Sequence, residues 1–143
     1  MSAAADPSRV IALARGWLGT PHHHQASLRG VGCDCLGVVR GIWRELGRAD
    51  PQAIPPYSLD WGEAGAREVL RDGLAAHLIA VALPPAPGDV VLFRMRSYAI
   101  AKHAAVLVAP DRMVHAHSRL GVIEESVTQA WWRRAAFAFR FPG

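Results

Sequence analysis

Residues 32–37 read Gly-Cys-Asp-Cys-Leu-Gly and place Cys35 where a glycine-flanked, extended loop turns into an apolar-periodic helix. A thiol in the first turn of a helix lies among backbone N–H groups that have no intrahelical acceptor, at the positive end of the helix dipole. Both features favour the thiolate, which is the nucleophilic form of cysteine. The stretch predicts a nucleophile at Cys35, and its alternatives are a buried structural thiol or half of a metal site.

The helix predicted from Cys35 carries apolar residues at three-to-four spacing and ends at Gly47. Asp34 precedes it and is predicted to cap it. Gly37 and Gly41 lie inside the helix, where each glycine costs roughly 1 kcal/mol relative to alanine. Both therefore predict the close approach of another backbone, which we expect to belong to a sheet.

Length and composition indicate one globular domain over residues 1–143, with 51% hydrophobic and 20% charged residues. The two cysteines are spaced C-x-C, too close for an easy disulfide, so we expect a reducing compartment and a structural role for Cys33. The first seven residues lack a basic region followed by an apolar core, and the longest apolar run is too short to span a bilayer. We expect synthesis in the cytoplasm without a signal peptide, and no membrane insertion.

The charge pattern gives little support to a nucleic-acid partner. The formal net charge of +4 and the pI near 9.8 favour anionic surroundings such as nucleic acid or cell-wall polymers. However, the chain has no run of basic residues and contains a single lysine, Lys102.

The first half of the chain is predicted to be helical with irregular connections. Asp6-Pro7 begins an apolar-periodic helix that Gly19 stops. The histidines at 22–24 follow in a polar loop, where adjacent side chains point apart and cannot all bind one ion, so we expect one of them to face a cleft. Residues 50–61 predict an irregular segment lining that cleft, and residues 63–83 predict a helix that Gly73 divides.

After the prolines at 84–87 the apolar period changes to that of strands. Strands are predicted at residues 89–94, 103–108, 113–117, 121–126 and 136–141, with a short helix or helical turn within 126–132. Helices followed by a meander of strands predict an α+β fold, in which the N-terminal helices pack on an antiparallel sheet of about five or six strands.

Two histidines in neighbouring strands predict a base and its orienting partner. His103 opens one strand and His115 lies on the next. A hairpin loop of three or five residues places both imidazoles on one face, whereas a two-residue loop at Pro110-Asp111 places them on opposite faces. A cysteine nucleophile needs such a base, and the helix that begins at Cys35 is expected to pack its N-terminus against the same face.

These motifs occur in a recognisable order: Asp-Cys-Leu-Gly at 34–37, His103 at the head of a strand, and Met-Val-His-Ala at 113–116. Trp-Leu-Gly-Thr-Pro at 17–21 and Pro-Gly-Asp-Val-Val at 87–91 belong to the same set. The set resembles the NlpC-type (NlpC/P60) cell-wall peptidases and covers most of the chain. It is most similar to the small peptidases encoded beside tail genes of phages and gene-transfer-agent particles.

The resemblance implies a papain-like fold and cleavage of peptidoglycan stem peptides, commonly at the bond between D-Glu and the diamino acid. It implies Cys35 as nucleophile, His103 as base and His115 as the residue that orients His103. It implies no cofactor and no metal. The partners expected from it are the peptidoglycan peptide and tail or baseplate proteins of a virion-like particle that brings the protein to the cell wall.

The sequence departs from the family pattern at two positions. Many members have a tyrosine near the oxyanion where this chain has His22, whose imidazole can also donate a hydrogen bond. Leu36 replaces the usual small serine after the cysteine. With Asp34 and His117, His22 makes up the predicted oxyanion and substrate-cleft residues.

Other functions remain open from the residues alone. His115 and His117 form an H-x-H pair on one strand, which with His103 makes a zinc hydrolase conceivable. A non-catalytic module in tail assembly, with the same fold, is the other alternative. The stretch Trp-Trp-Arg-Arg at 131–134 is expected to cover the sheet edge, and glycan or phosphate binding is its alternative.

Overall fold

A computed structural model describes residues 4–49 and 68–143 of the chain. The helices are α1 (Pro7–Arg15), α2 (Cys35–Glu45), α3 (Val69–Ala75) and α4 (Gln129–Trp132). The strands are β1 (Ser27–Leu28), β2 (Gly32–Cys33), β3 (Ile79–Val81), β4 (Val90–Phe93), β5 (His103–Ala109), β6 (Arg112–His117), β7 (Gly121–Ser126) and β8 (Ala135–Arg140). None of these helices has the length and apolar content needed to cross a bilayer.

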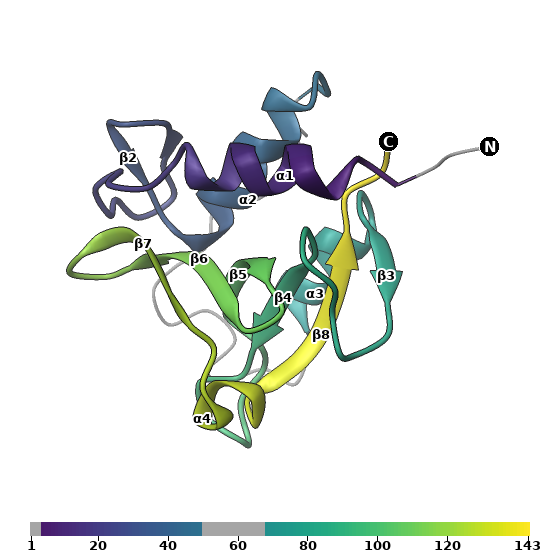
Figure 1. Cartoon of the computed structure of the whole chain (residues 1–143). Coiled ribbons are helices and arrows are strands. Elements are labelled where there is room, and N and C mark those ends of the chain that lie inside the picture. The colour runs from purple at the N-terminus through teal and green to yellow at the C-terminus, as the bar shows by residue number, and fades with distance from the viewer. Residues whose placement is uncertain (1–3, 50–67) are drawn as a thin grey trace.

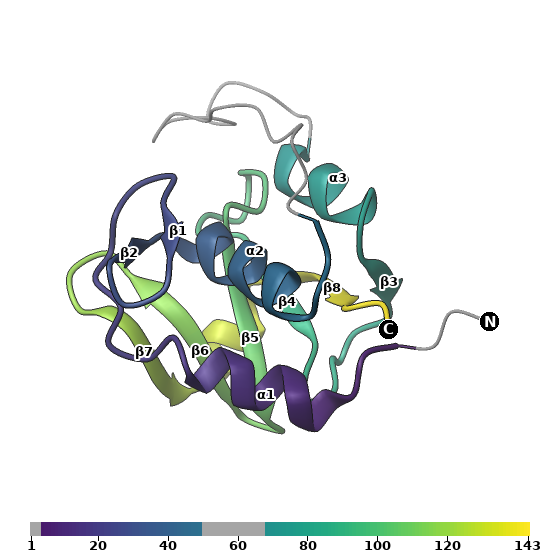
Figure 2. The same ribbon diagram turned by 90° about the horizontal axis from the view of Figure 1, so that it is seen from above.

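One six-stranded sheet organises the fold, in the order β3-β8-β4-β5-β6-β7 (Figure 1). Every adjacent pair is antiparallel. The first two helices lie together over one face of this sheet, whereas α4 lies on the other side (Figures 1 and 2). A small sheet of β1 and β2 precedes α2. The predicted α+β fold with helices on an antiparallel sheet is confirmed.

Alternation along the strands divides the core into two layers. Ala104 and Val106 of β5 belong to the cluster that contains the apolar residues of α1 and α2. Ala105 and Leu107 belong to a smaller cluster on the other face, against which the tryptophans of α4 pack. Successive side chains of a strand point to opposite faces, so the side chain of His103 belongs to the α4 face.

The hairpin of β5 and β6 reaches the required register by a route that we did not predict. Ala109 pairs with Arg112, which leaves a two-residue Pro110-Asp111 turn. A register shift between Leu107 and Ala109 then inserts one extra residue, so Leu107 pairs with Met113. The bulge cancels the change of face that a two-residue turn imposes, because it shifts the pairing by one residue. His103 and His115 consequently share a face.

The helix that begins at Cys35 packs on the sheet face opposite to the one predicted. Its buried residues join the cluster of Ala104 and Val106, whereas the two histidines lie on the α4 face. The expectation that the helix packs against the histidine face is therefore wrong. The N-terminus of α2 reaches His103 at the end of the sheet, where β5 begins.

The two glycines in α2 are required for different reasons. A Cβ at Gly37 would lie 2.0 Å from the carbonyl oxygen of Ala26, so the predicted close backbone is there, although it belongs to the loop before β1 rather than to the large sheet. At Gly41 the prediction is wrong, because the close neighbour is the side chain of Trp17, with its ring 1.9 Å from such a Cβ.

The segment between α2 and β4 differs from its prediction. Gly73 lies inside α3 and does not divide it, and Ile79 begins β3, which pairs with β8 at the sheet edge. The sequence does not distinguish a helix from a strand at Ile79, because the two look alike over a few apolar residues. The predicted cleft-lining segment 50–61 and the start of the 63–83 helix lie outside the described residues.

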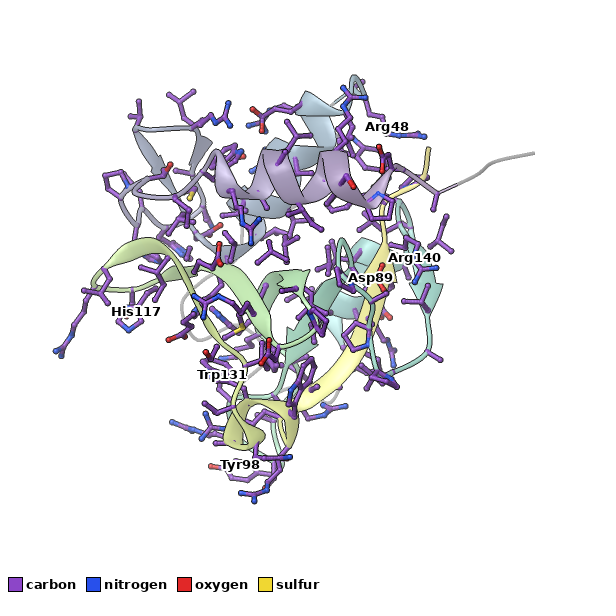
Figure 3. All side chains as sticks on the ribbon, in the orientation of Figure 1. Arg48, Asp89, Tyr98, His117, Trp131 and Arg140 are labelled. Carbon is purple, nitrogen blue, oxygen red and sulfur yellow. The ribbon has the colours of Figure 1, made fainter. Side chains whose placement is uncertain are left out.

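An ion pair between a buried aspartate and a partly exposed arginine fixes the start of β4 to β8. The carboxylate of Asp89 accepts hydrogen bonds from Nε and Nη2 of Arg140 at 2.8 and 3.0 Å, and Ala86 N–H donates to it at 2.8 Å. Figure 3 shows both side chains beside β8. Asp89 is buried, so these partners replace the water that its charge loses.

Exchanging Gly37 for alanine is expected to lower the free energy of unfolding by about 1–3 kcal/mol, the usual range for overpacking. The neighbouring Ala26 carbonyl cannot move freely, because it accepts a hydrogen bond from Asp34 N–H. Gly73→Ala is the matched control: nothing lies within 4 Å of its Cβ, so alanine is expected to stabilise α3 by about 0.5–1 kcal/mol. Urea denaturation measures both, and equal stability of Gly37→Ala and wild type would contradict the prediction.

Candidate active site

The sulfur of Cys35 lies against the start of β5. Its thiol donates a hydrogen bond to the carbonyl oxygen of Lys102 at 3.7 Å, and the backbone N–H of Ala104 also faces the sulfur. In the part of the chain that the structure describes, the thiol makes this hydrogen bond and none to the His103 ring. Cys35 is thus placed against the backbone on both sides of His103, and it is partly exposed.

The surroundings of Cys35 favour the thiol over the thiolate. Burial, followed by the Asp34 carboxylate, raises the pKa of this thiol to about 11. Backbone N–H groups, including those of Leu36 and Ala104, lower the pKa by a smaller amount. The expectation that the helix start favours the thiolate is therefore wrong here, because desolvation outweighs the local dipole.

His103 and His115 are in direct contact. Nε2 of His103 lies 2.8 Å from Nδ1 of His115, and the rings are nearly perpendicular at 87°. Burial lowers the pKa of His103 to about 3, with smaller contributions from His115, His117 and His22. Burial also lowers the pKa of His115, although Glu125 acts in the opposite direction. Both imidazoles are consequently neutral at pH 7.

Trp131 of α4, labelled in Figure 3, packs against this histidine pair. Its ring stacks on His103 with a centroid separation of 5.7 Å and meets His115 edge-on at 5.6 Å. It also packs edge-on against Phe93 at 4.9 Å. The expected position at the sheet edge is therefore wrong for Trp131, which lies over the sheet face that carries the two histidines.

Glu125 is a site residue that sequence reasoning missed. Its Oε1 atom lies 2.7 Å from Nε2 of His115. The residues singled out from the sequence include no acidic partner for the histidines. Met113 pairs with Glu125 across β6 and β7, and this places the carboxylate diagonally opposite His115. The available signal was the alternation along the strand 121–126, combined with a register that the sequence alone does not specify.

Asp34 caps α2 as predicted. Its Oδ1 accepts a hydrogen bond from Gly37 N–H at 2.7 Å, and its Oδ2 accepts one from Gln25 N–H at 2.8 Å. The residue is 6% exposed, so the structure assigns it to the support of the helix start. A side chain buried to this extent presents little surface to a substrate, which argues against the predicted role of Asp34 in lining the cleft.

His22 and His117 lie close enough to His103 for their charge to influence its pKa. His22 forms a parallel bridge with Cys33, which holds it beside the start of α2. Nδ1 of His117 accepts hydrogen bonds from the N–H groups of Arg119 and Leu120 at 3.0 and 3.2 Å. His117 therefore stabilises the β6–β7 turn, and both residues are partly buried around the site.

The histidines are not arranged as a zinc site. Nε2 of His103 and Nδ1 of His115 point at each other, so these two nitrogens cannot both bind one ion. Nδ1 of His117 is already occupied by backbone donors. Within residues 4–49 and 68–143, no group of three histidine, cysteine or acidic side chains has the arrangement to hold a metal ion.

A family model described as the NlpC/P60 family matches residues 19–141, which include Cys35, His103 and His115. The chain belongs to the NlpC/P60 family. This is a family of peptidoglycan hydrolases that are cysteine peptidases. The nucleophile and base predicted from the sequence have the chemistry of that class.

Known proteins resemble the chain in sequence or in fold. The chain is 27% identical over 127 residues to the "Murein DD-endopeptidase MepS/Murein LD-carboxypeptidase" of Escherichia coli K12, covering 89% of this chain and 58% of that protein's length. A Bacillus cereus NlpC/P60 family protein shares its fold, with a TM-score of 0.67, 20% identity, and coverage of 97% of this chain and 41% of the other. The NlpC/p60 domain of the peptidoglycan hydrolase SagA also shares the fold, with a TM-score of 0.59 and 20% identity. The match covers 94% of this chain and 98% of the SagA domain.

The reactivity of this NlpC/P60 chain toward alkylation is expected to rise steeply with pH. Since the pKa of Cys35 is raised to about 11, roughly one thiol in ten thousand is ionised at pH 7, and the iodoacetamide rate should increase about tenfold per pH unit up to about pH 10. Mass spectrometry of the modified peptide measures the rate. Cys35→Ala controls for Cys33, whose pKa burial raises to about 12. A rate that levels off below pH 8 would show a resting thiolate instead.

Proposed function

We propose that the protein is a cysteine endopeptidase that hydrolyses peptide bonds in the stem peptides of peptidoglycan. The observation that carries this proposal is the convergence of Cys35, at the start of α2, on the strand end that bears His103, which in turn contacts His115. Family membership supports the same reaction class.

The reaction begins with a neutral site. The Cys35 thiol attacks the substrate carbonyl while its proton passes to Nδ1 of His103, the nitrogen opposite to the one that contacts His115. His103 then returns this proton to the leaving amine as the peptide bond breaks. Water, deprotonated by His103, hydrolyses the acyl-enzyme and regenerates the thiol.

The oxyanion of the tetrahedral intermediate requires preorganised donors. The backbone N–H of Cys35 is one, since the first N–H groups of a helix have no intrahelical acceptor. His22 is the second donor in this proposal, in the place of the family tyrosine, and its bridge to Cys33 supports that role.

The bond cleaved is proposed to be that between D-Glu and the diamino acid, as in a D,L-endopeptidase. The E. coli relative is named for DD-endopeptidase and LD-carboxypeptidase activities, which act on other bonds, and this chain spans 58% of its length. The fragment masses from digested peptidoglycan distinguish these specificities.

Substituting Cys35 by alanine is expected to lower the release of new amino termini from purified peptidoglycan by at least about 10³-fold, because the nucleophile acts as a unit with its base. His103→Ala is expected to have a similar effect. A thiol alkylator should block the wild type and a chelator should not, which separates this chemistry from a zinc hydrolase. A wild type that binds tail proteins but releases no amino termini would instead establish the non-catalytic module.

We further infer that a virion-like tail carries the protein to the cell wall, a proposal that rests on its resemblance to peptidases encoded beside tail genes. Particles purified by density gradient are expected to contain the chain in the tail fraction, detected by mass spectrometry. Particles with Cys35→Ala should carry the chain equally but no longer digest peptidoglycan. Recovery of the chain only outside the particles would exclude this route.

A further inference from the structure

We propose that Glu125 is a positioning residue: its carboxylate sets which nitrogens of His115 and His103 carry protons, and leaves Nδ1 of His103 unprotonated to act as the base. The role of Nδ1 of His103 as the base rests on the proposed function. The protonation pattern itself does not, because it is a property of the resting protein.

Two successive hydrogen bonds connect Glu125 to His103. Oε1 of Glu125 lies 2.7 Å from Nε2 of His115, and Nδ1 of His115 lies 2.8 Å from Nε2 of His103. The three side chains therefore form a line that runs from β7 through β6 to the first residue of β5.

The direction of each hydrogen bond follows from the carboxylate. An ionised carboxylate only accepts, so Nε2 of His115 must carry the proton of the first bond. A neutral imidazole has one N–H, so Nδ1 of His115 is an acceptor and Nε2 of His103 donates the second bond. His103 is also neutral, and its Nδ1 is thereby left with its lone pair.

The surroundings of the two imidazoles protect the hydrogen bond between them from competition by water. Trp131 covers both imidazoles, and His115 is 2% exposed, so the bond between the two rings lies in a dry environment. The carboxylate end is more open, since the Glu125 side chain is 38% exposed. The acceptor that sets the pattern is thus at the solvent edge, and the nitrogens that it controls are inside.

Glu124 offers a matched control on the same strand. Its carboxylate accepts from Nε of Arg15 and from Nε of Arg112, each at 2.9 Å. Because adjacent strand residues point to opposite faces, this carboxylate has no part in the histidine contacts.

The first experiment is ¹⁵N NMR of the histidine rings in the full chain. In the wild type, Nε2 of both His103 and His115 is expected to be protonated and both Nδ1 atoms unprotonated. Glu125→Met removes the acceptor, so the ring ¹⁵N shifts should move toward values averaged over both tautomers. Glu125→Gln, whose amide oxygen can still accept, should lie between the two, and Glu124→Gln should match the wild type.

The second readout is turnover on peptidoglycan. Glu125→Met is expected to lower kcat/KM roughly 10- to 100-fold, as for other residues that orient a functional histidine, with partial rescue in Glu125→Gln and no change in Glu124→Gln. A proton on Nδ1 of wild-type His103, unaltered ¹⁵N shifts in a folded Glu125→Met protein, or an unaltered kcat/KM would each overturn the proposal.

These outcomes are distinguishable from failure of the proposed function. If the wild type shows the expected protonation pattern but cleaves no peptide bond, the assignment of tautomers holds and the peptidase is excluded. If Glu125→Met does not fold, the wild-type spectrum alone still decides the assignment, because a proton on Nδ1 of His103 contradicts it.

Discussion

The register of β5, β6 and β7 is the constraint on which the site depends. Each strand contributes one residue to the line of His103, His115 and Glu125. A slip of one residue would turn a side chain to the opposite face, which α1 and α2 cover. The bulge between Leu107 and Ala109 is part of this constraint, since it reconciles a two-residue turn with a shared face for the histidines. A local irregularity at one end of the hairpin thus determines the chemistry at the other end.

The proposed nucleophile and its proposed base belong to opposite faces of the sheet. Cys35 approaches from the α2 side and rests on the backbone around Lys102, whereas His103 points into the layer covered by Trp131. The two meet where β5 begins. This arrangement requires close seating of α2, and the absence of side chains at Gly37 and Gly41 allows the Ala26 backbone and the Trp17 ring to lie against the helix.

Local signals in the sequence predicted the starts of α2, β5 and β7 and the position of His103 and His115 on neighbouring strands. They failed where the outcome depended on tertiary contacts. No glycine marks the bulge near Val108, and Glu125 gains its role from pairing between strands. The ionisation of Cys35 was also mispredicted, because the dipole of a helix start is visible in sequence whereas burial by the rest of the chain is not.

A neutral resting site has a physical advantage in this fold. Holding a thiolate at the start of α2 and an imidazolium beneath Trp131 permanently would carry a desolvation cost in every folded molecule, whereas a thiol and a neutral imidazole carry little. In the proposed reaction, positive charge appears on His103 only during attack, when it faces the developing negative charge on the substrate. Glu125 lies at the outer end of the same line and already raises the pKa of His115 against the effect of burial. Its carboxylate can therefore stabilise that transient charge through His115 without being buried itself, which explains why the acid belongs at the solvent edge rather than beside the base.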